Sequence, residues 1–284
     1  MERVSILGDL SFSRIVYGMW RLADDVDRSE ANVRAKIDAC LEQGITTFDQ
    51  ADIYGDYESE EVFGAALKAD PSLRDKMEIA TKCGIMLTTD KVPSRRVKHY
   101  DTSRAHITTS VENSLTRMGI ERIDLLMIHR PDPFMDPEET GAALDGLVSS
   151  GKVASIGVSN FKPYDIRLLD GAMASPLVAN QIEISVLHTE PFVDGDLAEI
   201  MERSMAPMAW SPLAGGALFE SENAALLFAL QKIGDRFAVD ATAVALAWLL
   251  AHPAKILPVV GTNTMPRIRA LSDALKVEMD RQTW

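Results

Sequence analysis

The stretch IDLLMI at residues 123–128 is apolar at five of its six positions, and ILPVV at residues 256–260 has the same short, apolar character. Strands that are buried on both faces have continuous apolar sequences, whereas a strand with one solvated face alternates between apolar and polar residues. Strands of the first kind occur in parallel sheets that are covered by helices. The two stretches therefore predict a parallel sheet with helices packed against it.

Eight such strands can be read along the chain, and each is followed by an amphipathic stretch. We expect the strands at 14–20, 45–49, 77–82, 123–128, 153–158, 177–184, 207–210 and 256–260. We expect helices near 30–43, 58–69, 101–118, 137–150, 163–173, 194–203, 223–237, 240–251 and 266–277. Residues 4–13 predict a small hairpin. Eight strand–helix units predict a closed (β/α)₈ barrel, the TIM barrel, preceded by an N-terminal β-hairpin.

A doubly wound sheet is the alternative architecture. Such a sheet usually carries a G-x-G-x-x-G turn after its first strand, and the chain has no such turn. Two helix starts can be read from capping residues. Asp27 and Glu30 predict a capping box for the first helix, and Asp101 or Thr102 is expected to cap the helix that ends at Met118.

Length and composition limit the possible classes of protein. The chain has 284 residues, of which 46% are hydrophobic and 25% charged, and no linker divides it. We therefore expect one domain over residues 1–284. The 42 acidic residues outnumber the 29 basic ones, and a net charge of −13 argues against a nucleic-acid partner.

Two cysteines, Cys40 and Cys83, form neither a disulfide framework nor a zinc-binding pattern. They favour a cytoplasmic protein that holds no metal. The first residues, MERVSILGDLSF, lack the pattern of a secretory signal, and the apolar run at 241–251 is too short to span a bilayer. The sequence thus predicts no membrane association.

Polar residues follow the predicted strands at the end where barrel enzymes carry out their chemistry. Asp49 and Tyr54 follow the second strand, Lys82 ends the third and His129 ends the fourth. A lysine cation near a phenol favours the phenolate and lowers the tyrosine pKa. Asp49 would hold Lys82, and His129 would orient a carbonyl oxygen toward Tyr54. These four residues therefore suit proton transfer to a carbonyl oxygen that is being reduced.

Seven segments in order carry a family resemblance: GITTFDQADIYG, IATKCG, IDLLMIHRPDP, GKVASIGVSNF, NQIEIS, MAWSPLAGG and VVGTNTMPRI. In sequence and spacing the chain resembles the aldo-keto reductases, above all their bacterial short-loop oxidoreductases. The resemblance implies a (β/α)₈ barrel that uses NAD(P)H to reduce an aldehyde or ketone. It also implies that Tyr54 is the proton donor, that Asp49 and Lys82 support it, and that His129 orients the substrate.

The resemblance further assigns residues to the cofactor and the substrate. Ser159, Asn160 and Gln181 match residues that bind the nicotinamide carboxamide, and Trp210 stands where an aromatic ring stacks on the nicotinamide. Ser211, Leu213, Gly215 and Gly216 match the loop at the pyrophosphate, and Gly261, Thr262, Asn263 and Arg267 match the segment at the adenosine 2′-phosphate. Trp20 would line the substrate pocket together with Tyr54 and His129.

NADPH is the expected cofactor, with NADH as the alternative. A 2′-phosphate needs cationic or polar partners in an acidic chain, and Arg267 lies where the family places an arginine. Many members also have a lysine where this chain has Gly261, so one positive charge is missing. No sequence feature identifies the substrate, and we expect an open site that accepts several carbonyl compounds.

Other interpretations stay open from the sequence alone. Tyr57 is a second possible proton donor, and the basic segment KVPSRRVKHY at residues 91–100 is either a solvated loop or a rim that attracts anionic substrates. Lys82 could instead form a Schiff base, as in aldolases, and the chain could be a nicotinamide-nucleotide sensor without catalysis.

Overall fold

Eight parallel strands close into a barrel in the computed structural model, which describes residues 1–284. The strands are β3 (Val16–Gly18), β4 (Thr47–Asp49), β5 (Glu78–Cys83), β8 (Leu125–Ile128), β9 (Ile156–Ser159), β10 (Leu177–Glu183), β11 (Ala206–Trp210) and β12 (Leu257–Val260). They follow one another around the barrel in chain order, and β12 closes it on β3 with Val259 opposite Val16. The predicted barrel is confirmed.

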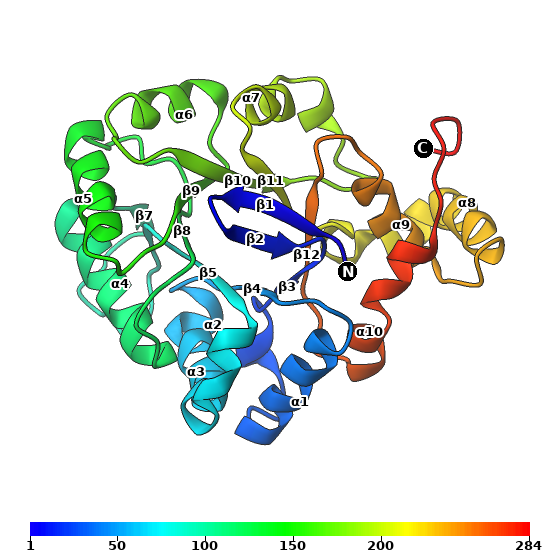
Figure 1. Cartoon of the computed structure of the whole chain (residues 1–284), viewed down its shortest axis with the longest axis horizontal. Helices are drawn as coiled ribbons and strands as arrows, with labels where there is room; N and C mark the ends of the chain where they lie inside the picture. Colours follow the sequence, from blue (N-terminus) through cyan, green and yellow to red (C-terminus); the bar gives the residue numbers. More distant parts are fainter.

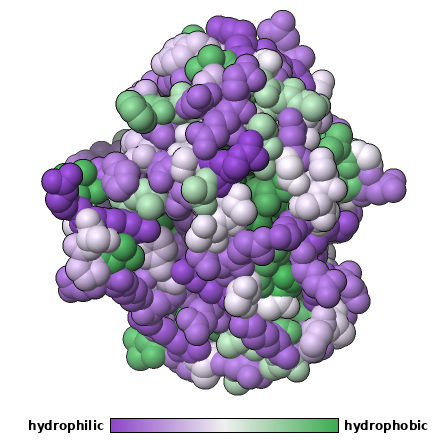
Figure 2. All heavy atoms as spheres, turned by 90° about the vertical axis from the view of Figure 1, so that its left-hand side faces the viewer, coloured by the Kyte–Doolittle hydropathy of each residue, from purple (hydrophilic) through white to green (hydrophobic).

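Helices surround the barrel, and a hairpin lies across one of its ends (Figure 1). The helices are α1 (Glu30–Leu41), α3 (Ser59–Ala69), α4 (Arg104–Met118), α5 (Pro137–Ser149), α6 (Pro163–Asp170), α7 (Asp196–Glu202), α8 (Ala224–Asp235), α9 (Ala241–Leu250) and α10 (Met265–Arg269). The hairpin is β1 (Arg3–Leu7) with β2 (Leu10–Ser13), as predicted. The flank that carries α4 and α5 is mostly hydrophilic, with small apolar areas (Figure 2).

Two apolar layers stabilise this arrangement. The larger lies between strands and helices and includes Ile79 and Leu126. The smaller fills the barrel interior, where Val4 and Phe12 of the hairpin pack against strand residues such as Ala80. The hairpin therefore closes the end of the barrel at which the strands begin.

Strand alternation places the polar side chains of the candidate site inside the barrel. Ala80 and Met127 belong to the interior layer. Lys82 follows Ala80 by two positions and His129 follows Met127 by two, so both side chains point to the same side as those neighbours. Both therefore reach the end of the barrel opposite the hairpin.

Both predicted helix caps are wrong by one or two residues. The first helix is capped by Ser29, whose side chain accepts from the Asn32 N–H, and α4 is capped by Ser103. In each case the expected aspartate lies two residues earlier, and its carboxylate accepts the N–H of the capping serine, at 2.9 Å for both Asp27 and Asp101. The aspartates therefore fix the turn that leads into the helix, and the serines cap it.

The last predicted helix is also shorter than expected. It divides into α10, of five residues, and a 3₁₀ segment, Leu271–Lys276.

Close contact between α3 and α4 depends on Gly64 and yields a stability prediction. A Cβ atom at Gly64 would lie 2.1 Å from the carbonyl oxygen of Arg117, whereas one at Gly146 in α5 would meet nothing within 4 Å. Gly64→Ala should lower the free energy of unfolding by roughly 1–3 kcal/mol despite its better helix propensity. Gly146→Ala should raise it by up to about 1 kcal/mol. Urea unfolding followed by circular dichroism measures both, and equal stability of the two variants would contradict this packing.

Candidate active site

The four residues that were predicted to act together lie at one mouth of the barrel. Asp49 ends β4, Lys82 is the fifth residue of β5, and His129 directly follows β8. Tyr54 begins the short segment α2 (Tyr54–Tyr57), in the loop after β4. The C-terminal ends of three neighbouring strands therefore bring the four side chains together.

Lys82 is the centre of this cluster. Its side chain is fully buried, and its ammonium donates to Asp49 Oδ2 at 2.7 Å, to the Gln50 carbonyl at 2.9 Å and to Tyr54 Oη at 3.1 Å. Burial opposes the charged form, but Asp49 and Tyr54 raise the pKa of Lys82 above its ordinary value. Lys82 is therefore a cation with all three N–H donors used.

Two effects act in opposite directions on the pKa of Tyr54: the Lys82 charge lowers it, and burial raises it. Burial raises the pKa of Tyr54 and outweighs the opposing effect of the Lys82 charge. The expected net lowering of this pKa is wrong for the structure, because a buried phenolate loses more hydration than one ammonium restores. The phenol is accordingly protonated at neutral pH, which is the state an acid needs.

His129 faces Tyr54 edge to face, with the ring centroids 5.9 Å apart. Burial, followed by the charges of Lys82 and Arg130, holds the pKa of His129 well below its ordinary value. Its Nδ1 is buried without a hydrogen-bond partner. His129 is thus a neutral imidazole with unused hydrogen-bonding capacity beside the tyrosine.

A chain of hydrogen bonds extends from Asp49 to Trp210. Gln181 Nε2 donates to Asp49 Oδ1 at 2.9 Å, and the Gln181 carbonyl accepts from Ser159 Oγ at 2.9 Å. Asn160 Nδ2 donates to Ser159 Oγ at 2.8 Å, and Trp210 Nε1 donates to Asn160 Oδ1 at 2.9 Å. The residues predicted for the nicotinamide therefore adjoin the Asp49–Lys82–Tyr54 cluster without a gap.

The loop after β11 has the backbone geometry of an open turn. Ser211, Gly215 and Gly216 have φ values of 48°, 66° and 114°, which lie in the left-handed region. A Cβ at either glycine would meet nothing within 4 Å, so the main chain of this turn is accessible from outside. Leu213 packs against the outer apolar layer and anchors the turn.

The segment after β12 is held from behind by residues that sequence reasoning missed. Tyr17 Oη donates to the Thr262 carbonyl at 2.7 Å. Lys36 of α1 is buried, pairs with Asp25 and donates to Asn263 Oδ1 at 3.1 Å. A signal was present, because Lys36 lies in the apolar stripe of its helix with Val33. Arg267 is exposed on α10.

The two remaining aromatic candidates differ in position. Trp20 lies just beyond β3, where the neighbouring Met19 N–H donates to the Asp49 carbonyl at 2.9 Å, and its side chain is 57% exposed. Tyr57 is not beside Lys82: its hydroxyl accepts from Arg95 at 2.6 Å and from the Leu87 N–H at 3.1 Å. The geometry therefore favours Tyr54 over Tyr57 as proton donor.

Two buried carboxylates that no sequence pattern marks, those of Asp52 and Glu60, lie behind the cluster. Asp52 accepts from Ser110 Oγ at 2.8 Å, while its Oδ1 has no partner. Glu60 accepts from Thr81 at 2.7 Å and from Ser114 at 3.0 Å. Burial and the nearby Glu60 charge raise the pKa of Asp52 to about 7.

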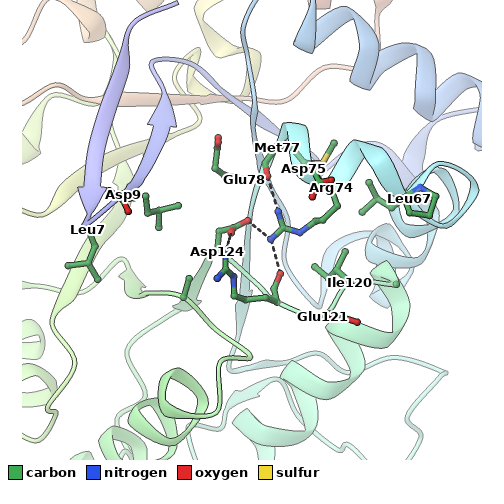
Figure 3. Close-up of a pocket in the computed structure, with 15 residues that line it drawn as sticks. Leu7, Asp9, Leu67, Arg74, Asp75, Met77, Glu78, Ile120, Glu121 and Asp124 are labelled. Atoms are coloured by element: carbon green, nitrogen blue, oxygen red, sulfur yellow. Dashed lines mark hydrogen bonds and ion pairs between the residues drawn. The ribbon is translucent and has the colours of Figure 1, made fainter.

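A cavity of about 770 Å³ lies at the opposite end of the barrel, beside the hairpin (Figure 3). The guanidinium of Arg74 points toward Asp124 there and donates to it at 2.8 Å, and also donates to the carbonyls of Met77 and Arg122. These polar groups already satisfy one another, so the mouth with Lys82 is the stronger candidate. The structure contains no group of three acidic, histidine or cysteine side chains that could hold a metal, and none of its helices is both long and apolar enough to cross a membrane.

Comparison with known proteins gives consistent matches over the whole chain. The sequence model of the Aldo/keto reductase family matches residues 14–284. A 6-dehydroglucose reductase from Agrobacterium fabrum is 60% identical over 284 residues, which cover 100% of this chain and 96% of the relative. A second 6-dehydroglucose reductase, from Novosphingobium aromaticivorans, is 39% identical, with 97% and 90% covered. The resemblance drawn from the seven segments is thereby confirmed.

The barrel also matches solved structures. A glycerol dehydrogenase from Gluconobacter oxydans superposes with a TM-score of 0.85, covering 99% of this chain and 92% of that one. Its sequence identity of 24% makes this a likeness of fold alone.

Asp52 gives the site a testable pH dependence. Its folded pKa of about 7 lies above the ordinary value, so the folded protein binds this proton more tightly than the unfolded chain does. The resulting stabilisation is complete below about pH 4 and is lost as the pH rises through about 7. Asp52→Asn should therefore be more stable than wild type by roughly 1 kcal/mol or more at pH 8, and this advantage should shrink toward pH 4.

Urea unfolding between pH 4 and pH 9 measures this difference. Asp90→Asn is the matched control, because Asp90 is exposed and has no hydrogen-bond partner. The groups that face Asp52 are Ser110, Glu60, Arg117 and Cys83. A stability difference for Asp52→Asn that does not change with pH would show that Asp52 does not hold its proton in this way.

Proposed function

The chain belongs to the aldo/keto reductase family, a family of carbonyl-reducing oxidoreductases, and we propose that it uses NADPH to reduce the C6 aldehyde of 6-dehydroglucose to the alcohol. The observation that carries the proposal is the contact of a buried, charged Lys82 with Tyr54 Oη at 3.1 Å. The proposal takes residues 1–284 as one catalytic domain in the cytoplasm, a reducing compartment in which cysteines such as these two stay unpaired.

Tyr54 is the proposed acid. Neutral His129 donates a hydrogen bond to the carbonyl oxygen and aims it at Tyr54, whose hydroxyl proton passes to that oxygen as the alcohol forms. The Lys82 ammonium, 3.1 Å away, stabilises the phenolate left behind. Asp49 keeps Lys82 charged and in place through the contact of 2.7 Å.

The cofactor is proposed to lie along the hydrogen-bonded chain next to the cluster. When bound, it supplies the hydride that reduces the carbonyl carbon. Ser159, Asn160 and Gln181 offer hydroxyl and amide groups to a carboxamide, and Trp210 offers a flat ring for stacking. The open turn of Ser211, Leu213, Gly215 and Gly216 presents backbone to a pyrophosphate. The unpartnered Nδ1 of His129 fits a site completed by further molecules.

The sugar substrate rests on the two relatives named 6-dehydroglucose reductase and on the character of the mouth. Trp20 exposes an aromatic face, and Arg130, which lies over the Trp210 ring at 5.7 Å, has no ion-pair partner. Aromatic faces and free guanidinium donors suit a polyhydroxylated compound.

A Schiff-base mechanism and a non-catalytic sensor are less well supported. Lys82 is a charged ammonium whose donors are all used, whereas an amine nucleophile has to be neutral. A sensor would not need Asp49, Tyr54, Lys82 and His129 in contact at a single mouth.

Tyr54→Phe tests the proposed chemistry. It removes the proton donor and should lower kcat/KM for 6-dehydroglucose by about 10²–10⁴-fold, with unchanged affinity for NADPH. Lys82→Met should remove most activity, and Lys82→Arg should not restore it because the guanidinium differs in shape. NADPH oxidation at 340 nm and fluorescence titration give the two quantities. Tyr164→Phe, an exposed tyrosine on α6, is the control. Turnover by Tyr54→Phe near that of the control would refute the role of Tyr54. The proposed substrate would be refuted if the wild-type protein reduced simple aldehydes but did not reduce 6-dehydroglucose.

Arg267→Ala tests the preference for NADPH. The proposed pairing of Arg267 with the 2′-phosphate is a charge-assisted bond, so its loss should weaken NADPH binding by about ten- to hundred-fold and leave NADH binding unchanged. Arg269→Ala is the matched control, since Arg269 is also exposed on α10. Dissociation constants of both cofactors decide the matter. Equal weakening of NADPH and NADH, or equal affinities of wild type for the two, would exclude a 2′-phosphate contact at Arg267.

A further inference from the structure

The chain turns left-handed at three consecutive residues directly after Tyr54. Gly55, Asp56 and Tyr57 have φ values of 57°, 53° and 68°. Glycine adopts this conformation freely, but each non-glycine residue in it carries steric strain. A Cβ at Gly55 would lie only 2.1 Å from the Cβ of Ala23, so the turn is also closely packed. Strain of this kind persists only where surrounding groups hold the backbone in place.

The groups that hold this turn come from the loop between β6 (Ile85–Met86) and β7 (His99–Tyr100). Lys91 Nζ donates to the Asp56 carbonyl at 2.6 Å and pairs with Glu58 at 2.6 Å. Thr89 Oγ1 donates to Asp56 Oδ2 at 3.0 Å. The strained peptide is therefore bound through its main chain and through the side chain of its middle residue.

Tyr57 is bound by the same loop. Its hydroxyl accepts from Arg95 Nη1 at 2.6 Å and from the Leu87 N–H at 3.1 Å, and the guanidinium of Arg95 lies 5.4 Å from the centre of the tyrosine ring. Lys91 and Arg95 thus direct their charges at the turn. Arg96, between them and β7 (His99–Tyr100), is exposed and its side chain forms no hydrogen bond or ion pair.

We propose that residues 87–95 form a clamp that fixes the left-handed turn, and that Lys91 and Arg95 are positioning residues for Tyr54. The inference rests on the proposed role of Tyr54 as the acid. It gives the basic segment 91–100 a function other than attracting an anionic substrate. If the clamp is released, the turn relaxes toward ordinary φ values and Tyr54 Oη moves away from Lys82.

A displacement of about 1 Å at a reacting group lowers turnover by roughly a hundred-fold. Arg95→Met and Tyr57→Phe, which remove the two sides of one hydrogen bond, should each lower kcat by roughly ten-fold or more. Affinity for NADPH should not change, because none of the clamp contacts involves the segments proposed for the cofactor. Arg95→Lys, which retains a donor and the charge, should recover part of the activity.

The matched control is Arg96→Met, which removes the same charge from the same loop without touching the turn. Its kcat should equal that of wild type. The solvent deuterium isotope effect on kcat should rise in Arg95→Met and Tyr57→Phe, because proton transfer from a displaced Tyr54 becomes slower. A loss of folded protein alone would lower the rate without changing this isotope effect.

Three results overturn the clamp. These are wild-type kcat in both Arg95→Met and Tyr57→Phe, an unchanged isotope effect in a slowed variant, and an equal loss in Arg96→Met, which would indicate a general field of positive charge. Tyr57→Phe answers the question if Arg95→Met does not fold. The proposed function is tested separately: an active Tyr54→Phe refutes it, whereas an inactive Tyr54→Phe with fully active Arg95→Met and Tyr57→Phe refutes the clamp alone.

Discussion

A single buried ammonium, that of Lys82, sets the conditions for the rest of the mouth. A charge withdrawn from water costs several kcal/mol unless partners surround it, and removing one partner of a buried pair typically costs about 3–5 kcal/mol. Asp49, the Gln50 carbonyl and Tyr54 are those partners. Because the second oxygen of Asp49 accepts from Gln181, the requirement of one lysine ties β4, β5 and β10 together.

The barrel could be predicted because each of its strands is marked by a short stretch of neighbouring residues. Each apolar run marks a strand buried on both faces, and the alternation along β5 and β8 then fixes which side chains point inward. Lys82 and His129 were identifiable for this reason: each ends an apolar strand and shares the inward parity of its neighbour, Ala80 or Met127. The residues proposed for the cofactor followed from motif resemblance, and the structure brings the four assigned to the nicotinamide, Ser159, Asn160, Gln181 and Trp210, into one hydrogen-bonded chain.

The features that were missed depend on contacts between distant segments. The contact of Lys36 with Asn263 joins positions 227 residues apart, and no local pattern contains both. The raised pKa of Asp52 arises from its depth and from Glu60, neither of which is visible along the chain. The left-handed turn after Tyr54 has a glycine at its first position only. The other two positions hold residues that rarely adopt the left-handed conformation, so the sequence did not predict the turn. The cap predictions were wrong for a different reason. An aspartate and a serine two residues later are both good capping residues, and the sequence does not show which of the two caps the helix.

The hairpin at the floor of the barrel has a consequence for access to the site. Val4 and Phe12 pack into the interior layer and cover this end of the barrel, so the polar cluster faces the opposite end. In the proposed reduction, the hydride donor and the hydride acceptor then share a single entrance. Packing at the end of the barrel farthest from the polar cluster therefore sets the side from which both reactants of the proposed reduction approach.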